Sequence, residues 1–389
     1  MVVFFNFTGS LSNDIYLPGL ITIAKSFYTS EFMSQLTVSM WFLGAALPQP
    51  YFGILANRYG PRKLMIGGSI LFILATAGCG LAWNIYSLLT FRFGQGAAVA
   101  SAAIASLAIV QDPNYSSLAR LRFITWIYIS DALTPLLGPL VGSFLISEWG
   151  WRSSFALLLI LGIICASGLY YFLPRNKDGY TKTTWKSFYQ PSFGHPYLWK
   201  LIILFISFYG SVVAYITTAP FIIMGQLKIP IKYFGITQIF PFLFFVAGGL
   251  TLSLLMTPQR QKKFSHLGVV IMFISVLIFL AMNIFTQYFT LSYFLLAIST
   301  YLYGFSLTSN ILAASILSIN LNKAMIAAIF GVSLPLIAVL SSLLTATFYN
   351  NNLWGFSTIF IAFFFIALIL YIYILKSKPT FLIPNNDPH

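Results

Sequence analysis

Long runs of apolar residues, bounded by charged or glycine- and proline-rich turns, recur along the whole chain. They fall at approximately 1–24, 34–56, 64–83, 87–111, 120–147, 152–174, 198–224, 232–256, 267–284, 288–318, 324–349 and 354–375. A helix crosses the hydrocarbon core of a bilayer with about 20 apolar residues, which is close to the length of these runs. We therefore predict an all-α membrane protein with twelve transmembrane helices.

The longest polar stretch, 175–197, separates the first six runs from the last six. This division predicts an N-terminal six-helix bundle over 1–174, a linker over 175–197, a C-terminal six-helix bundle over 198–376 and a tail over 377–389. Short basic loops at 57–63 and 258–263 follow the second run of each half. Such an internal repeat favours two related halves with a substrate site between them, near the middle of the membrane.

Composition agrees with a membrane protein, because 59% of the residues are hydrophobic and only 7% are charged. A soluble domain carries roughly 25% charged residues. The net charge of +14 could indicate nucleic-acid binding, but sixteen of the twenty-one basic residues fall on one side of the predicted membrane and four on the other. This asymmetry is typical of the positive-inside rule and predicts that both termini are cytoplasmic. We therefore expect the lipid bilayer as a partner and no nucleic acid.

Three charged side chains fall inside predicted spans: Asp14, Asp131 and Arg92. A charge at the middle of a bilayer costs at least roughly 2.5–3.5 kcal/mol, so such residues either pair structurally or form a proton or cation site. Arg92 either extends to the interface or biases the two carboxylates. Burial favours the neutral form of a carboxyl group and a nearby arginine favours its ionised form. A carboxylate between these influences can take up and release protons.

The C-terminal half carries no acidic residue within a predicted span. Its polar groups are neutral, such as Asn310, Asn320, Tyr215 and Thr217, so we expect ion coupling in the N-terminal half and cavity walls in the C-terminal half. The two cysteines lie in apolar runs, and neither metal-ligand spacing nor a nucleophile–base pair is evident. We expect no metal and no enzymatic activity, with protons as coupling ions in place of a cofactor.

Four strings, in order along the N-terminal half, resemble the major facilitator superfamily and, within it, the MdfA/Bcr-like bacterial drug–proton antiporters. They are 13–19 (NDIYLPG), 53–63 (GILANRYGPRK), 92–96 (RFGQG) and 135–142 (PLLGPLVG). The resemblance implies a major facilitator fold of two six-helix bundles in a bacterial inner membrane, working as a monomer. It further implies alternating access that exports an amphipathic or cationic small molecule in exchange for protons.

The resemblance also implies roles for individual residues. Asp14 would be the main protonation site and Arg92 the group that tunes it. Asp131, at a place that we expect to be apolar in close relatives, is our own hypothesis for a second protonation site. Candidate substrate contacts are Asn13, Asp14, Tyr215 and Ile216. Candidate gating residues are Gly53, Asn57, Arg58, Gly60, Arg62, Asp112, Pro135, Gly138, Pro139 and Gly142.

Local chemistry agrees with several of these gating roles. Gly138 and Gly142 are four residues apart, so both lie on one helix face that a neighbouring helix can approach closely. Gly60 permits a tight reversal, and Asp112 is a candidate partner for Arg58 or Arg62. A solvated surface pair of little energetic value is the alternative for that contact.

The chain also departs from the family pattern. Asn57 stands where the family usually has aspartate, and Pro61 stands where it has a basic residue. Asn6 occupies the place of a second acid that usually precedes the Asp14 position by eight residues. We interpret Asp131 as that second carboxylate in a new location.

Two other functions stay open from the sequence. One is a transporter for a single metabolite, such as a siderophore exporter, or an importer. The other is a membrane sensor or scaffold without transport, which the changes at Asn57 and Pro61 favour. The retained intramembrane acids argue against the second, because they would be costly in a scaffold.

Overall fold

The computed structural model describes residues 1–110, 116–173, 194–285, 289–319, 321, 323–350 and 352–377, and Asp112, Asn320 and most of the predicted linker lie outside them. Within these residues every regular element is helical. The N-half (residues 1–173) contains α1 Val2–Asp14, η1 Leu17–Gly19, α2 Leu20–Ser26, α3 Glu31–Ala46, α4 Gln49–Tyr59, α5 Pro61–Gly80, α6 Ile85–Val110, α7 Ser117–Trp149 and α8 Arg152–Phe172. The C-half (residues 194–377) contains α10 Pro196–Pro220, η2 Phe221–Gln226, α11 Ile231–Leu255, η3 Pro258–Arg260, α12 Gln261–Ile284, α13 Leu291–Ser318, α14 Lys323–Phe348 and α15 Leu353–Ser377.

Twelve membrane crossings arise from these helices, as predicted. Ten described helices are long and apolar enough to span a bilayer by themselves. The remaining two crossings are broken: α1, η1 and α2 form the first, and α3 and α4 form the second. Pro18 and Pro48 lie at the breaks, where proline lacks the amide proton that a continuous helix needs. The sequence predicted both crossings as single runs.

The two halves repeat one packing pattern, as their matching run structure predicted. In the N-half α6 packs on both α3 and α5, and in the C-half α13 packs on both α11 and α12. Likewise, α1 packs on α7 and α10 packs on α14. Each element corresponds to the one six crossings later, so the halves are structural repeats.

Close helix crossings in the N-half depend on glycine. A side chain at Gly44 would collide with the Phe93 carbonyl, and one at Gly96 would collide with the Trp41 carbonyl. These two glycines bring α3 and α6 into backbone contact, which is the usual role of small residues between membrane helices.

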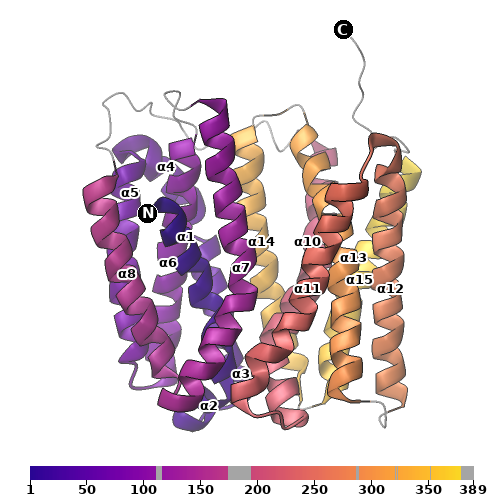
Figure 1. Cartoon of the computed structure of the whole chain (residues 1–389), viewed down its shortest axis with the longest axis horizontal. Helices are drawn as coiled ribbons and strands as arrows, with labels where there is room; N and C mark the ends of the chain where they lie inside the picture. The colour runs from indigo at the N-terminus through magenta and orange to yellow at the C-terminus, as the bar shows by residue number, and fades with distance from the viewer. Residues whose placement is uncertain are drawn as a thin grey trace.

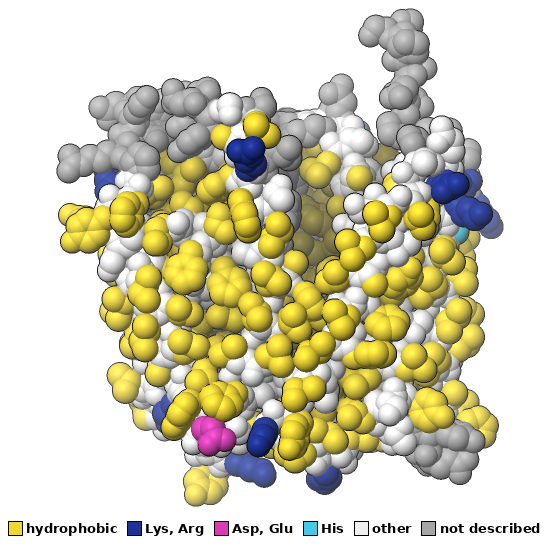
Figure 2. Space-filling model, in the orientation of Figure 1, with side chains coloured by type: hydrophobic (Ala, Val, Ile, Leu, Met, Phe, Trp, Pro, Cys, Tyr) yellow, Lys and Arg dark blue, Asp and Glu magenta, His cyan; other side chains and the backbone are white. Residues whose placement is uncertain are grey.

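The two most extensive contacts between the halves are α3 with α14, and α7 with α11. They are related by the same six-crossing offset. We call the end of the molecule where the chain passes from residue 173 to residue 194 the linker end, and the opposite end the far end. Figure 1 shows the halves side by side, with α7 and α11 converging toward the far end. Figure 2 shows the surface hollowed between the halves toward the linker end.

The outer surface is suited to lipid. Figure 2 shows hydrophobic side chains over the middle of the molecule, with Lys and Arg at its two ends and acidic side chains at the far end. Large apolar side chains such as Leu74, Leu254 and Ile369 are more than 60% exposed. An apolar belt between two charged ends matches the apolar core of a bilayer, which lies between two polar headgroup regions.

Candidate functional site

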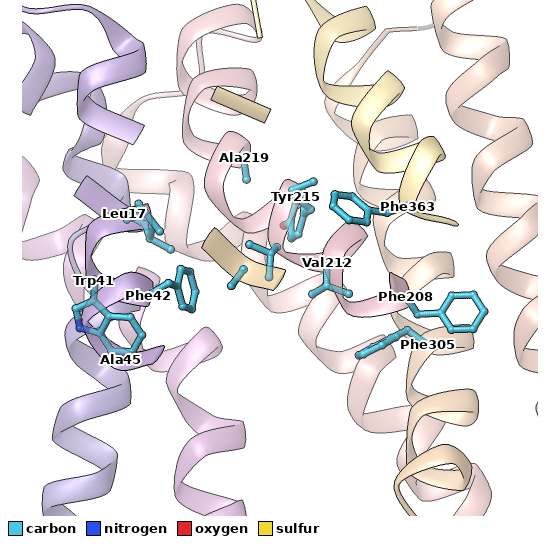
Figure 3. Packing of buried hydrophobic residues seen from close by; sticks show 14 of the residues in the cluster. Leu17, Trp41, Phe42, Ala45, Phe208, Val212, Tyr215, Ala219, Phe305 and Phe363 are labelled. Atoms are coloured by element: carbon cyan, nitrogen blue, oxygen red, sulfur yellow. The ribbon is translucent and has the colours of Figure 1, made fainter. Parts of the chain in front are cut away.

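A cavity of about 360 Å³ lies between the halves, within the size range of small-molecule sites. It is lined by Asp14, Leu17, Asp131, Ala132, Pro135 and Pro139 of the N-half, and by Tyr209, Val212, Tyr215, Ile216, Phe234, Gln238, Pro241, Phe242, Phe245, Leu302 and Phe305 of the C-half. Both intramembrane acids therefore open onto one space. Figure 3 shows three of these lining residues, Leu17 of the N-half and Val212 and Tyr215 of α10, among the packed hydrophobic side chains of the two halves.

Asp14 is the last residue of α1, at the point where the first crossing breaks. Its side chain is 7% exposed, and the Asn13 amide nitrogen donates to its Oδ1 at 3.0 Å. Gly138 of α7 lies directly against it: a Cβ there would be 2.5 Å from the Asp14 Cβ. The helix break and this close approach place the carboxyl group at the cavity wall, where the Thr134 side chain of α7 is a second hydrogen-bond partner.

Asp131 of α7 also lines the cavity and is an exposed residue. The Ser10 hydroxyl donates to Asp131 Oδ1 at 2.8 Å. Ser10 lies four residues before Asp14 on α1. The point where Asp131 contacts α1 is therefore about one helical turn, or about 5.4 Å along the axis, from the point where the Asp14 side chain leaves it. They are near enough to interact electrostatically.

Asn6, at the position where the family resemblance predicts a second acid, is not among the residues that line this cavity. Its amide donates to the Val2 carbonyl at 2.9 Å and to the Ser106 hydroxyl at 2.7 Å. The cavity thus holds two carboxylates although this position on α1 carries none. This arrangement agrees with a relocated second carboxylate at Asp131, which stays a prediction.

Arg92 is fully buried, so it does not extend to the membrane interface. Its Nη1 donates to the Ser12 carbonyl at 2.9 Å and to Gln95 Oε1 at 2.5 Å. Its Nε donates to the Thr37 carbonyl at 3.4 Å, and its guanidinium lies 4.0 Å from the Tyr16 ring centroid. Its electrostatic influence reaches Asp14. Among the described contacts, Arg92 makes no ion pair with a carboxylate, and it holds α1, α3 and α6 together.

The C-half wall is aromatic and its polar groups are largely paired. Tyr215 donates to Gln238 Oε1 at 2.5 Å, and the Gln238 amide nitrogen donates to Thr237 at 2.9 Å. Ile216 lines the same wall. Asn310 and Thr217, which we expected to contribute polarity, instead donate to carbonyls of their own helices, those of Ser306 and Val213.

The loop between the second and third crossings adopts the predicted turn. Gly60 has φ +84°, a left-handed value that favours glycine, and α5 begins immediately after it. Arg62 donates to the Tyr170 carbonyl at 2.8 Å, and the Arg58 guanidinium lies 5.3 Å from the Tyr59 ring centroid. A Cβ on Gly53 would meet no heavy atom within 4 Å.

Two members of the predicted gate are not described. Asp112 lies outside the described residues, and so does the side chain of Asn57. The predicted contact of Asp112 with Arg58 or Arg62 therefore stays a prediction.

The proline- and glycine-rich string of α7 lies at the centre of the assembly. Side chains at Gly138 and Gly142 would collide with Asp14 and with the Ile15 carbonyl, so this glycine face packs on the first crossing of the same half. The adjoining Pro139 belongs to the seam between halves, because a Cβ on Gly235 of α11 would be 2.5 Å from the Pro139 carbonyl oxygen. Pro135 lines the cavity one turn away.

Sequence reasoning did not identify several lining or supporting residues. Ser10, Tyr209, Gln238 and Phe305 belong to this group. Gln238 carried a signal, since it is an amide within an apolar run. The aromatic residues carried none, because the chain has 39 phenylalanines and most membrane-facing positions look alike.

Comparison with known proteins places this architecture. The family model of the Major Facilitator Superfamily matches residues 2–325. The chloramphenicol resistance protein CraA of Acinetobacter baumannii is 25% identical over 94% of this chain and 89% of its own length. The multidrug transporter MdfA of Yersinia pestis is 23% identical over 91% and 87%, and the multidrug resistance protein MdtM of Escherichia coli is 22% identical over 84% and 82%.

Solved structures share the fold. A partially occluded, inward-open structure of the xylose transporter XylE from E. coli has a TM-score of 0.74 at 16% identity and covers 97% of this chain and 98% of its own. An inward-facing bacterial homologue of the lysosomal transporter Spinster has a TM-score of 0.72 at 16% identity, covering 98% and 97%. Members of this family are transporters and not enzymes, as the sequence predicted. The chain belongs to the Major Facilitator Superfamily.

Proposed function

We propose that this protein exports amphipathic or cationic small molecules across a bacterial inner membrane in exchange for protons. The observation that carries the proposal is the cavity itself. Two carboxylates, Asp14 and Asp131, occupy one wall, aromatic side chains occupy the other, and none of the described lining residues is basic. A cation with an apolar body matches both walls, through charge on one side and cation–π contact on the other.

Competition for Asp14 couples the two fluxes. With the far end closed and the linker end open, a cation from the cytoplasm replaces the proton on this carboxyl group. The halves then rock about the cavity, the far end opens, and a proton from outside displaces the cation. The proton and the cation occupy the same carboxyl group in turn, and each leaves only when the other replaces it. The proton gradient therefore drives export of the cation.

The remaining site residues support this exchange. Asp131 supplies a second proton site, held by Ser10, and acts on Asp14 electrostatically. Asn13 orients the Asp14 carboxylate through its amide. Tyr215 and Ile216 contact the apolar body of the substrate from α10.

Several wider features of the proposal follow from relatives and from charge distribution. CraA, MdfA and MdtM are named for drug resistance or multidrug transport, which supports efflux over uptake. The excess of basic residues on one side supports a cytoplasmic location for the linker end and both termini. We propose a monomer, because the cavity is complete within one chain.

Transport by purified protein in proteoliposomes tests this function. Vesicles with an imposed pH gradient would be given radiolabelled tetraphenylphosphonium, a neutral lipophilic drug, or a hydrophilic siderophore. We expect gradient-driven movement of the lipophilic cation. Movement of the siderophore alone would favour a single-metabolite exporter, and movement of no compound by folded protein would contradict proton-coupled drug export.

A further inference from the structure

Two tyrosines of α10, Tyr209 and Tyr215, line the cavity, but their hydroxyl groups differ. The Tyr215 hydroxyl is bonded to Gln238 on the same wall. The half-buried Tyr209 has no hydrogen-bond partner among the described residues. Its ring centroid lies 6.4 Å from that of Phe305, which also lines the cavity. A free hydroxyl on the cavity wall is thus available to a ligand or to a facing residue.

Asp14 is the facing residue. It lines the same cavity from the N-half, interacts electrostatically with Tyr209, and is followed by η1, which contacts α10 directly. The other charged or titratable groups around Asp14 are Asp131 of α7, Arg92 of α6 and Tyr215 of α10. Arg92, in the N-half, donates to carbonyls and to Gln95 and keeps a buried Nη2 without a hydrogen-bond partner, and in the C-half the Tyr215 hydroxyl is bonded to Gln238.

We propose that Tyr209 is the C-half donor that favours the ionised form of Asp14 and thereby sets the pH at which the transporter releases its proton. The hydroxyl rotates freely about its C–O bond, so its O–H can orient toward the carboxylate directly or through one water. In a cavity with apolar walls such an interaction is stronger than in bulk water. Tyr209 is a positioning residue, and this role rests on the proposed function of Asp14.

The sign of the effect follows from this arrangement. A donor stabilises the carboxylate and not the carboxylic acid, so its loss keeps the proton on Asp14 to higher pH. Phenylalanine at position 209 retains the aromatic body and removes only the donor. The same substitution at Tyr303 of α13, which does not line the cavity, removes a hydroxyl that pairs with Thr251, and it is the matched control for the pH midpoint.

Proton release by purified protein tests the inference. Tetraphenylphosphonium would be added to wild type, Tyr209→Phe, Tyr303→Phe and Asp14→Asn in weakly buffered detergent solution, and the protons released would be measured with a pH-sensitive dye across a pH series. We expect the midpoint for Tyr209→Phe to rise by at least about 0.5 pH unit, which is about threefold in proton affinity. Tyr303→Phe should keep the wild-type midpoint and Asp14→Asn should release none.

An infrared titration without substrate gives an independent reading. The carboxyl band that disappears in Asp14→Asn should titrate at higher pH in Tyr209→Phe, even if that variant binds the probe poorly. Equal midpoints in wild type and Tyr209→Phe, or an equal shift in Tyr303→Phe, would overturn the inference and leave antiport intact. Absence of proton release in wild type would contradict the proposed function, while the infrared midpoints would still decide the role of Tyr209.

Discussion

Replacing Gly235 with alanine adds one methyl group to the seam that closes the far end. Gly235 of α11 faces Pro139 and Leu140 of α7, and its backbone N–H donates to the Ser143 hydroxyl at 2.8 Å. These contacts cross from one half to the other. The methyl group therefore acts on the conformation in which the far end is closed, and not on the interior of either half.

The structure sets the magnitude. The added Cβ would lie 2.5 Å from both the Leu140 Cα and the Pro139 carbonyl oxygen, whereas ordinary contact begins near about 3.5 Å. The two helices must separate by about 1 Å, and overpacking of this kind costs about 1–3 kcal/mol. Only the far-end-closed state bears that cost, so the ratio of closed to open molecules should fall by about 5–150-fold. The higher helix propensity of alanine acts on both states and cancels.

Pulsed electron spin resonance can measure this shift. Spin labels at Tyr28 and Lys232, both exposed, would report the separation of the two halves at the far end. We expect Gly235→Ala to move the distance distribution to longer values. Gly249→Ala on the same helix is the matched control, because its Cβ would meet only Ser306 Oγ, at an ordinary 3.6 Å. A wild-type distribution for Gly235→Ala, or an equal change in Gly249→Ala, would refute the reasoning.

Three further changes test other contacts. The hydroxyl oxygens of Ser39 on α3 and Ser342 on α14 lie 2.6 Å apart, so cysteines at these two positions should form a disulfide on oxidation. The disulfide should block transport until it is reduced; transport by the cross-linked protein would contradict relative movement of α3 and α14. Arg92→Lys should destabilise the protein by about 1.5–3 kcal/mol, because lysine cannot replace the bonded guanidinium fork, and an unchanged melting temperature would contradict the bracing role of Arg92. Ser10→Ala removes a donor to the Asp131 carboxylate, so the pH midpoint of transport should rise by about half a unit or more; the same rise in an Asp131→Asn background would show that Asp131 is not its cause.

Much of the fold was predictable because the membrane imposes it. Any segment that crosses lipid must be a long apolar helix, so the runs and the polar gap at 175–197 predicted twelve crossings in two halves. The breaks after Asp14 and Ala46 were not predicted. Proline occurs both at these breaks and inside the continuous helix α7, at Pro135 and Pro139, so its presence alone does not locate an interruption.

The site was predictable where residues are rare and not where they are common. Asp14 and Asp131 stand out among seven acids, and both line the cavity. Tyr209 does not stand out among 22 tyrosines, because its role depends on which face of α10 points toward the N-half. From the sequence, Arg92 could either extend to the membrane interface or lie near the two carboxylates. Only the structure distinguishes the two environments, because it shows that Arg92 is buried and donates to the Thr37 carbonyl.

The most direct test of the central claim is proton movement in inside-out membrane vesicles. A pH gradient reported by a quenched fluorescent dye would be established with wild type, Asp14→Asn or Asp131→Asn, and lipophilic cations or neutral drugs would be added. Substrate-dependent dequenching in wild type that disappears in Asp14→Asn is the predicted result. Dequenching that persists in Asp14→Asn, or that no compound produces in wild type of verified folding, would contradict proton-coupled export through this carboxylate.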